Sequence, residues 1–141
     1  MRIILDTNVL VAALKSRRGA SYAILSQLPS PRFQIALTIP LYLEYQDVLT
    51  RPEPMTGAST PEEILSFVRY LCRIAHRQEV FFLWRPWLRD PKDDMVLEAA
   101  VASQSRYIVT HNVRDFRNRN VENYFGIEPI TPQVFLDLIG R

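Results

Sequence analysis

The sequence predicts an α/β fold with a central, mostly parallel sheet of four or five strands. Short apolar runs alternate along the chain with segments whose apolar residues recur every three or four positions, as is typical of parallel α/β proteins. Residues 3–5, Ile-Ile-Leu, form an unbroken apolar run suited to a strand buried on both faces. Residues 9–14 then repeat at helical spacing, so we expect the chain to open with a strand followed by a helix.

The later elements follow from the same patterns. The clearest helix start is Thr60-Pro-Glu-Glu63, which combines an N-cap threonine, a proline in the first turn and a glutamate that can complete a capping box. Residues 51–59 and 84–90 are predicted to be irregular, and the polar stretch 110–120 is assigned no helix or strand. We expect further strands at residues 33–37, 79–83, 107–109 and 127–130, and helices at 22–28, 39–50, 61–75, 91–104 and 132–139.

Length and composition favour one globular domain covering residues 1–141. Hydrophobic residues make up 48% of the chain, enough for a sizeable core. No apolar stretch approaches the roughly 20 residues needed to span a bilayer, and the N-terminus has no signal-peptide pattern. The single cysteine, Cys72, cannot form an internal disulfide. A cytoplasmic protein with no membrane partner is therefore expected.

The basic residues are unevenly divided between arginine and lysine. Of the 17 basic residues, 15 are arginines and only Lys15 and Lys92 are lysines, while the net charge is a modest +2. Arginine can make bidentate hydrogen bonds to phosphate, although the base composition of the genome explains the bias equally well. The four glycines form no glycine-rich loop, which argues against a nucleotide-binding fingerprint.

Two acids in the first third of the chain are candidate site residues. Asp6 follows the first predicted strand directly, and ligands of open α/β sheets collect at the carboxyl ends of the strands. A turn or cap would explain Asp6 equally well, and we expect Asn8 to cap the first helix. Glu44 falls at the margin of the apolar face of the helix 39–50, whereas Asp47 falls towards solvent. Glu44 also fits an ordinary boundary position.

The second half of the chain carries further acids at the start of a helix that is apolar almost all round. Asp90 is expected to be the N-cap and Asp93 to complete the capping interaction. Asp94 lies one turn before Glu98, and two carboxylates at that spacing repel each other unless a cation lies between them. A first-turn carboxylate that interacts with the helix dipole is the plainer explanation of Asp94.

The segment after the strand 107–109 is also polar. Thr110 and Asn112 are small polar residues at its carboxyl end, and Asp115 is the nearest acid. His111 and His76 lack the spacing of a structural zinc site. Carboxylates without a cysteine cluster point instead to a hard cation such as Mg²⁺ or Mn²⁺, and a pair of such ions can activate water against a phosphodiester.

In these motifs the sequence resembles PIN-domain ribonucleases of the VapC-like toxin type over nearly its whole length. Ile-Leu-Asp6-Thr-Asn8-Val-Leu, Leu-Glu44-Tyr-Gln-Asp-Val-Leu and Asp94-Met-Val-Leu-Glu98-Ala-Ala match three motifs of that family, and Thr110-His-Asn112-Val-Arg-Asp115-Phe matches the fourth. The resemblance implies that Asp6, Glu44 and Asp94 bind the metal. Many members have an aspartate where this chain has Asn112, and Asp115 could replace the missing charge.

The resemblance also carries expectations for the whole protein. It implies a three-layer α/β/α sandwich, Mg²⁺- or Mn²⁺-dependent cleavage of RNA, frequent homodimers and a neutralising antitoxin partner. Asn8, Glu98, Thr110 and Asp115 are supporting residues in this hypothesis. Two alternatives stay open: a degenerate domain that binds RNA or protein without cutting, favoured by Asn112, and a haloacid-dehalogenase-like phosphatase. The phosphatase needs a second aspartate where this chain has Asn8.

Overall fold

A five-stranded parallel sheet forms the centre of the protein in the computed structural model, which describes residues 1–51, 59–80, 88–117 and 119–140. Every pair of neighbouring strands is parallel, and the strand order is β3-β2-β1-β4-β5. The strands are β1 (Arg2–Leu5), β2 (Gln34–Leu37), β3 (His76–Arg77), β4 (Tyr107–Val109) and β5 (Glu128–Ile130).

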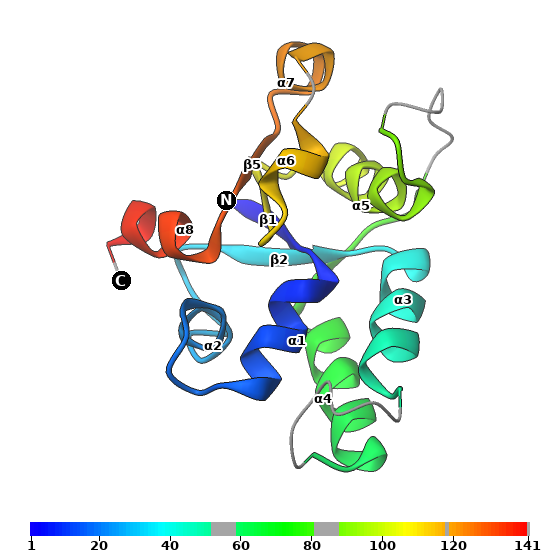
Figure 1. Ribbon diagram of the computed structural model, residues 1–141, viewed down its shortest axis with the longest axis vertical. Helices are drawn as coiled ribbons and strands as arrows, with labels where there is room; N and C mark the ends of the chain where they lie inside the picture. The colour runs from blue at the N-terminus through cyan, green and yellow to red at the C-terminus, as the bar shows by residue number, and fades with distance from the viewer. Residues whose placement is uncertain (52–58, 81–87, 118, 141) are drawn as a thin grey trace.

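Helices cover both faces of this sheet, so the fold has the three layers of an α/β/α sandwich. In Figure 1, α1, α2 and α4 lie on one side of the sheet and α5 and α7 on the other. None of the helices in the described ranges combines the length and the apolar character needed to cross a membrane. The helices are α1 (Thr7–Lys15), α2 (Ala20–Leu25), α3 (Ile39–Leu49), α4 (Pro61–Ile74), α5 (Pro91–Ala102), α6 (Val113–Phe116), α7 (Arg119–Phe125) and α8 (Pro132–Ile139).

Most of the predicted elements are confirmed, and the side-chain caps explain where several helices begin. Thr60 forms the expected capping box with Glu63 at the start of α4. The hydroxyls of Thr38 and Thr131 cap α3 and α8, and Asp90 caps α5. Each cap accepts a hydrogen bond from a backbone N–H that the first helical turn leaves without a partner.

Three local predictions were wrong. The cap of α1 is Asp6, not Asn8, because the helix begins directly after β1. The third strand is the pair His76–Arg77 rather than 79–83; residues 79 and 80 lie outside any strand, and 81–83 lie outside the described residues. The polar stretch 110–120 contains α6 and the start of α7, whose few apolar residues give too short a pattern for a helix to be recognised.

The sheet order places a crevice at the carboxyl ends of its central strands. From β1 the chain moves outwards through β2 to β3, and it then returns to the other side of β1 to form β4 and β5. Ligands of open α/β sheets bind at such a reversal. The residues that follow β1 and β4, Asp6 and Thr110, are thereby brought side by side at the same edge, at the centre of the domain.

Candidate metal-binding cleft

Asp6 is held at the end of β1 by hydrogen bonds to both of its carboxylate oxygens. Its backbone N–H extends the sheet by donating to the carbonyl of Val109 at 2.9 Å. Oδ1 accepts from the N–H of Thr7 at 2.8 Å, and Oδ2 accepts from the hydroxyl of Thr110 at 2.7 Å. The carboxylate is therefore fixed in orientation by groups from two adjacent strand ends.

Thr110 organises the loop that leaves β4. Its side chain is fully buried, and its backbone N–H donates to the carbonyl of Ile130 at 2.9 Å. Besides donating to Asp6, its hydroxyl oxygen accepts from the backbone N–H of Asn112 at 3.0 Å. Asn8 supports the same loop, because its Oδ1 accepts from the backbone N–H of His111 at 3.3 Å. Two of the four predicted supporting residues, Thr110 and Asn8, thus hold the segment that carries Asn112.

Glu44 reaches the same edge from α3. The next residue, Tyr45, is buried and donates its hydroxyl to the carbonyl of Leu5 at the end of β1. Burial, followed by the nearby charge of Asp6, raises the pKa of the Tyr45 hydroxyl well above its ordinary value, so this hydroxyl keeps its proton. That contact ties α3 to the central strand and leaves the half-buried Glu44 facing the cleft.

The first turn of α5 contributes Asp93, not Asp94, to the cleft. Asp94 is buried, and its Oδ1 accepts from the backbone N–H of Leu88 at 3.0 Å. Glu98, one turn further on, is buried as well, and neither acid lines the cleft. Successive residues of a helix point about 100° apart, so a helix that directs Asp93 into the cleft directs Asp94 elsewhere. The structure thus places Asp94 outside the lining of the cleft that holds Asp6 and Glu44, and its role as a metal ligand stays a prediction.

Two residues of the α6 segment complete the cleft. Asn112 precedes α6 without using its side chain as a cap, and Asp115 lies within the helix. His111 lies outside the cleft lining, since its ring Nε2 is 3.0 Å from the hydroxyl of Ser21 on α2. The cleft has a volume of about 190 Å³ and is lined by Asp6, Thr7, Asn8, Glu44, Asp90, Lys92, Asp93, Met95, Val96, Asn112 and Asp115.

Two carboxylates in this cleft, those of Asp6 and Asp93, have raised pKa values. Burial is the main cause of the raised pKa of Asp6, and the charges of Asp115 and Glu44 add to it; the hydrogen bonds from Thr110 and Thr7 oppose the shift. Burial also raises the pKa of Asp93 to about 6, with further contributions from Asp90, Asp6, Asp115 and Asp94. Lys92 is the one basic side chain that lines the cleft within the described ranges. The cleft is therefore strongly negative and favours a cation.

The donor set suits a hydrated Mg²⁺ or Mn²⁺ ion. The oxygen donors come from carboxylates and from the amide of Asn112, and a hard cation would offset the repulsion between the acids. Among the residues that the structure describes, no three His, Cys, Asp or Glu side chains converge as a ready-made ligand set. Mg²⁺ does not need one, because it usually keeps several waters and binds through one or two carboxylates.

Sequence patterns missed Asp93 and Lys92 as cleft residues. The signal that separates them from Asp94 is weak, because α5 is apolar on almost every side and defines no single buried face from which directions could be measured. The other candidates depended on strand ends or on a clear apolar stripe. Asp6, Asn8, Glu44, Asn112 and Asp115 are brought to one cleft by three different stretches of chain: the start of α1, α3 and the α6 segment.

The open parallel sheet, with an acidic cleft at the carboxyl ends of its central strands, places the protein among the α/β folds that bind ligands at this edge of the sheet. A family profile described as PIN domain matches residues 2–114. The chain therefore belongs to the PIN-domain family, as the sequence motifs predicted. No curated protein sequence matches it.

A solved structure has the same fold. A chain of the crystal structure of VapBC2 from Rickettsia felis, bound to a DNA fragment from their promoter, is similar to this protein with a TM-score of 0.57 and 15% sequence identity. The similarity covers 93% of this chain and 98% of that chain. At this identity the likeness shows the fold, and it confirms the predicted α/β/α arrangement.

Proposed function

We propose that the protein is a metal-dependent endoribonuclease and the toxin of a toxin–antitoxin pair. The observation that carries this proposal is the meeting of Asp6, Glu44, Asp93 and Asp115 in one cleft, at the point where the sheet order reverses. Membership of the PIN-domain family supports a nuclease, and the fold shared with a chain of a VapBC2 complex supports the toxin assignment.

In this proposal each cleft residue has a separate task. Asp6, Glu44 and Asp93 would hold Mg²⁺ or Mn²⁺, which supplies an activated water and neutralises charge on the phosphate. Asn112 would offer a neutral carbonyl oxygen, and Asp115 would add negative charge nearby. Thr110 and Asn8 would keep Asp6 and the loop in place through the hydrogen bonds described above. The ammonium of Lys92 would attract the RNA phosphate at the rim of the cleft.

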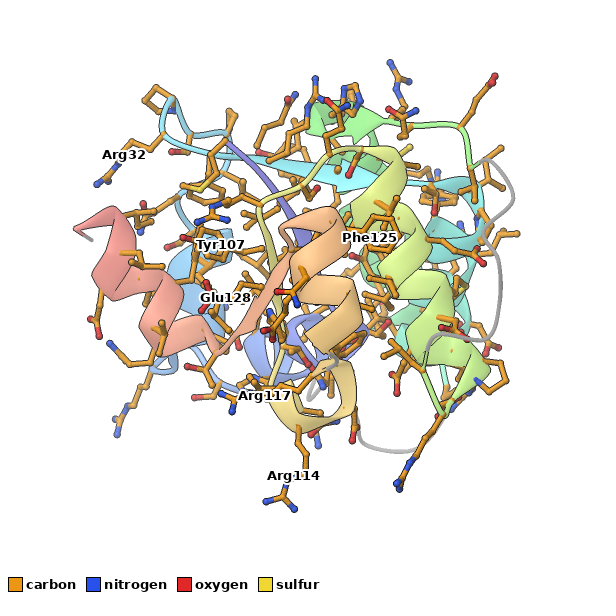
Figure 2. The ribbon with its side chains drawn as sticks, turned by 90° about the horizontal axis from the view of Figure 1, so that it is seen from above. Arg32, Tyr107, Arg114, Arg117, Phe125 and Glu128 are labelled. Carbon is orange, nitrogen blue, oxygen red and sulfur yellow. The ribbon has the colours of Figure 1, made fainter. Side chains whose placement is uncertain are left out.

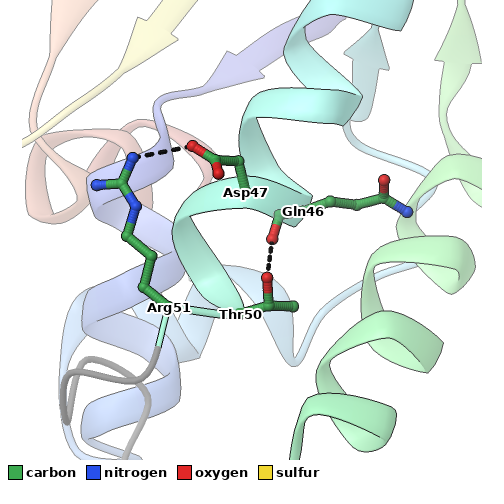
Figure 3. A network of polar contacts seen from close by, with 4 residues as sticks. All are labelled: Gln46, Asp47, Thr50 and Arg51. Atoms are coloured by element: carbon green, nitrogen blue, oxygen red, sulfur yellow. Dashed lines mark hydrogen bonds and ion pairs between the residues drawn. The ribbon is translucent and has the colours of Figure 1, made fainter.

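The test is cleavage of single-stranded RNA by the purified chain with Mg²⁺ or Mn²⁺, compared with the chain in EDTA. Asp6→Asn and Glu44→Gln should abolish cleavage and leave the thermal unfolding transition in place. Asp47→Asn is the matched control on the same helix, because Asp47 is exposed and pairs with Arg51 at 2.9 Å at the solvent side of α3 (Figure 3). Cleavage by Asp6→Asn at the wild-type rate would contradict the proposal.

A module that binds RNA or a protein without cutting remains the second candidate. It is favoured by the neutral Asn112 at the fourth position, and by the lack of three converging His, Cys, Asp or Glu side chains among the described residues. Titration with Mn²⁺ separates the two candidates, because a binding-only module needs no ion at the acids. The phosphatase hypothesis is left without support, since the chain belongs to the PIN-domain family and carries Asn8 rather than a second aspartate.

The proposal extends to partners and location. A toxin of this kind would act on cytoplasmic RNA, form a homodimer and be neutralised by a cognate antitoxin protein. Light scattering of the purified chain tests the dimer. Expression of the wild-type chain should arrest growth while Asp6→Asn does not, and co-expression of the antitoxin should restore growth.

A further inference from the structure

A second pocket, larger than the cleft, lies between β5 and α7. Its volume is about 540 Å³, against about 190 Å³ for the cleft. We propose that this pocket binds one nucleotide of the RNA strand that enters the cleft, and that it prefers a base with an exocyclic amino group. The proposal rests on the proposed ribonuclease function, and it names the site that would select the RNA sequence.

Two guanidinium groups make the pocket attractive to a phosphate. Arg106 is held in place, because its Nη1 donates to the carbonyl of Gly126 at 3.1 Å and its guanidinium carbon lies 5.3 Å from the centre of the Tyr107 ring. Arg117 also lines the pocket, is exposed, and makes no ion pair within the described part of the chain. Arg106, which is held in place, and the exposed Arg117 can together bind the phosphates of a nucleic-acid backbone.

The pocket and the cleft are linked through the chain at the end of α6. Asp115 lines the cleft and Arg117 lines the pocket, and two residues separate their Cα atoms by at most about 7 Å. Figure 2 shows Arg117 beside α6, with Arg114 of the same helix pointing away from the ribbon and Glu128 on the neighbouring β5. A strand whose phosphodiester occupies the cleft would therefore reach Arg117 with an adjacent nucleotide.

The remaining lining of the pocket can distinguish bases. Glu122 and Glu128 are exposed carboxylates that only accept hydrogen bonds, while Ile127 and Pro129 add apolar surface. A carboxylate repels phosphate but accepts from an amino group on the edge of an unstacked base. Adenine, cytosine and guanine carry such an amino group, and uracil does not. The arginines would hold the backbone while the glutamates read the base.

The test is binding of labelled oligo(C) and oligo(U) of about 12 nucleotides to the full chain carrying Asp6→Asn in Mg²⁺, followed by fluorescence anisotropy. Oligo(C) and oligo(U) differ at the amino group that the carboxylates would read. Arg117→Ala should weaken oligo(C) binding by about fivefold to tenfold and lower the salt slope of log K by about 0.7, while Arg117→Lys keeps the slope. Arg69→Ala is the control, because Arg69 is exposed on α4 at the opposite face of the sheet.

Glu122→Gln combined with Glu128→Gln should shrink the preference for oligo(C), because the new amide groups can donate to the uracil carbonyl. Equal binding by Arg117→Ala and Arg69→Ala, equal binding of oligo(C) and oligo(U), or an Asp6→Asn chain that binds neither RNA would each overturn the inference. If the Asp6→Asn chain binds RNA as expected but the wild type does not cut it, the pocket inference is supported and the nuclease proposal is contradicted. If the wild type cuts RNA but Arg117→Ala binds RNA as well as Arg69→Ala does, the nuclease proposal is supported and the pocket inference is contradicted.

Discussion

Thr110 donates its hydroxyl hydrogen to Oδ2 of Asp6 at 2.7 Å, although 104 residues separate the two in the chain. The bond joins the ends of two adjacent parallel strands. It also lowers the pKa of Asp6, against the burial that raises it. The residue that orients the acid thus helps to keep it charged and able to bind a cation.

Replacing Thr110 by valine should therefore weaken both the site and the fold. The pKa of Asp6 should rise further, and the N–H of Asn112 should lose its acceptor. We expect the acidic limb of the pH–activity profile to move to higher pH and the free energy of unfolding to fall by about 1–3 kcal/mol. Thr110→Ser keeps the hydroxyl and serves as the control. An unchanged pH profile in Thr110→Val would contradict the assigned role.

Asp93 and Asp94 should differ sharply when mutated. Because Asp93 lines the cleft, Asp93→Asn should lose both Mn²⁺ binding, measured by calorimetry, and RNA cleavage. Its unfolding transition should stay normal. Asp94→Ala should instead reduce the free energy of unfolding by about 1–3 kcal/mol, because the N–H of Leu88 loses its acceptor. Asp94→Asn retains an acceptor and should keep Mn²⁺ binding. Loss of Mn²⁺ binding in Asp94→Asn but not in Asp93→Asn would show that Asp94, not Asp93, is the third metal ligand.

The metal-free protein should become less stable as the pH rises from about 4 to about 7. The pKa of Asp93 is about 6 in the folded chain, against about 3.9 for an unfolded aspartate, so the folded state binds more protons within this window. The raised pKa of Asp6 acts in the same direction. Urea unfolding in EDTA measures the effect, which should be on the order of 1 kcal/mol after solvent screening. Asp93→Asn or added Mg²⁺ should flatten the curve, and a rise of stability with pH would contradict the cleft electrostatics.

Lys92 should contribute to RNA binding through its charge. It lines the cleft beside five carboxylates that repel phosphate. Lys92→Ala should weaken single-stranded RNA binding in the Asp6→Asn background and reduce the slope of log K against log[NaCl] by about 0.7. Lys15→Ala is the natural control, because the chain has only these two lysines and Lys15 lies at the far end of α1. Equal slopes in the two variants would exclude a phosphate contact by Lys92.

Local patterns were sufficient for most of the fold. The apolar run of β1, the capping box at Thr60 and the prolines in the first turns of α3, α4, α5 and α8 each specify an element through neighbours in the chain. Alternation of strands and helices then implies a parallel sheet. The two-residue β3 could not be predicted from the sequence, because such a strand is defined by its pairing with β2 rather than by its own residues.

The sequence by itself determined the α/β class, the PIN-domain motifs and the edge of the sheet at which Asp6 and Thr110 meet, because those features depend on neighbouring residues and on strand direction. Only the tertiary structure decided which acid of Asp93 and Asp94 enters the cleft. A helix buried on almost every side carries no pattern that marks one direction, so the packing of α5 alone sets which carboxylate faces Asp6. The pocket of Arg106 and Arg117 likewise exists only where α7 folds back beside β5.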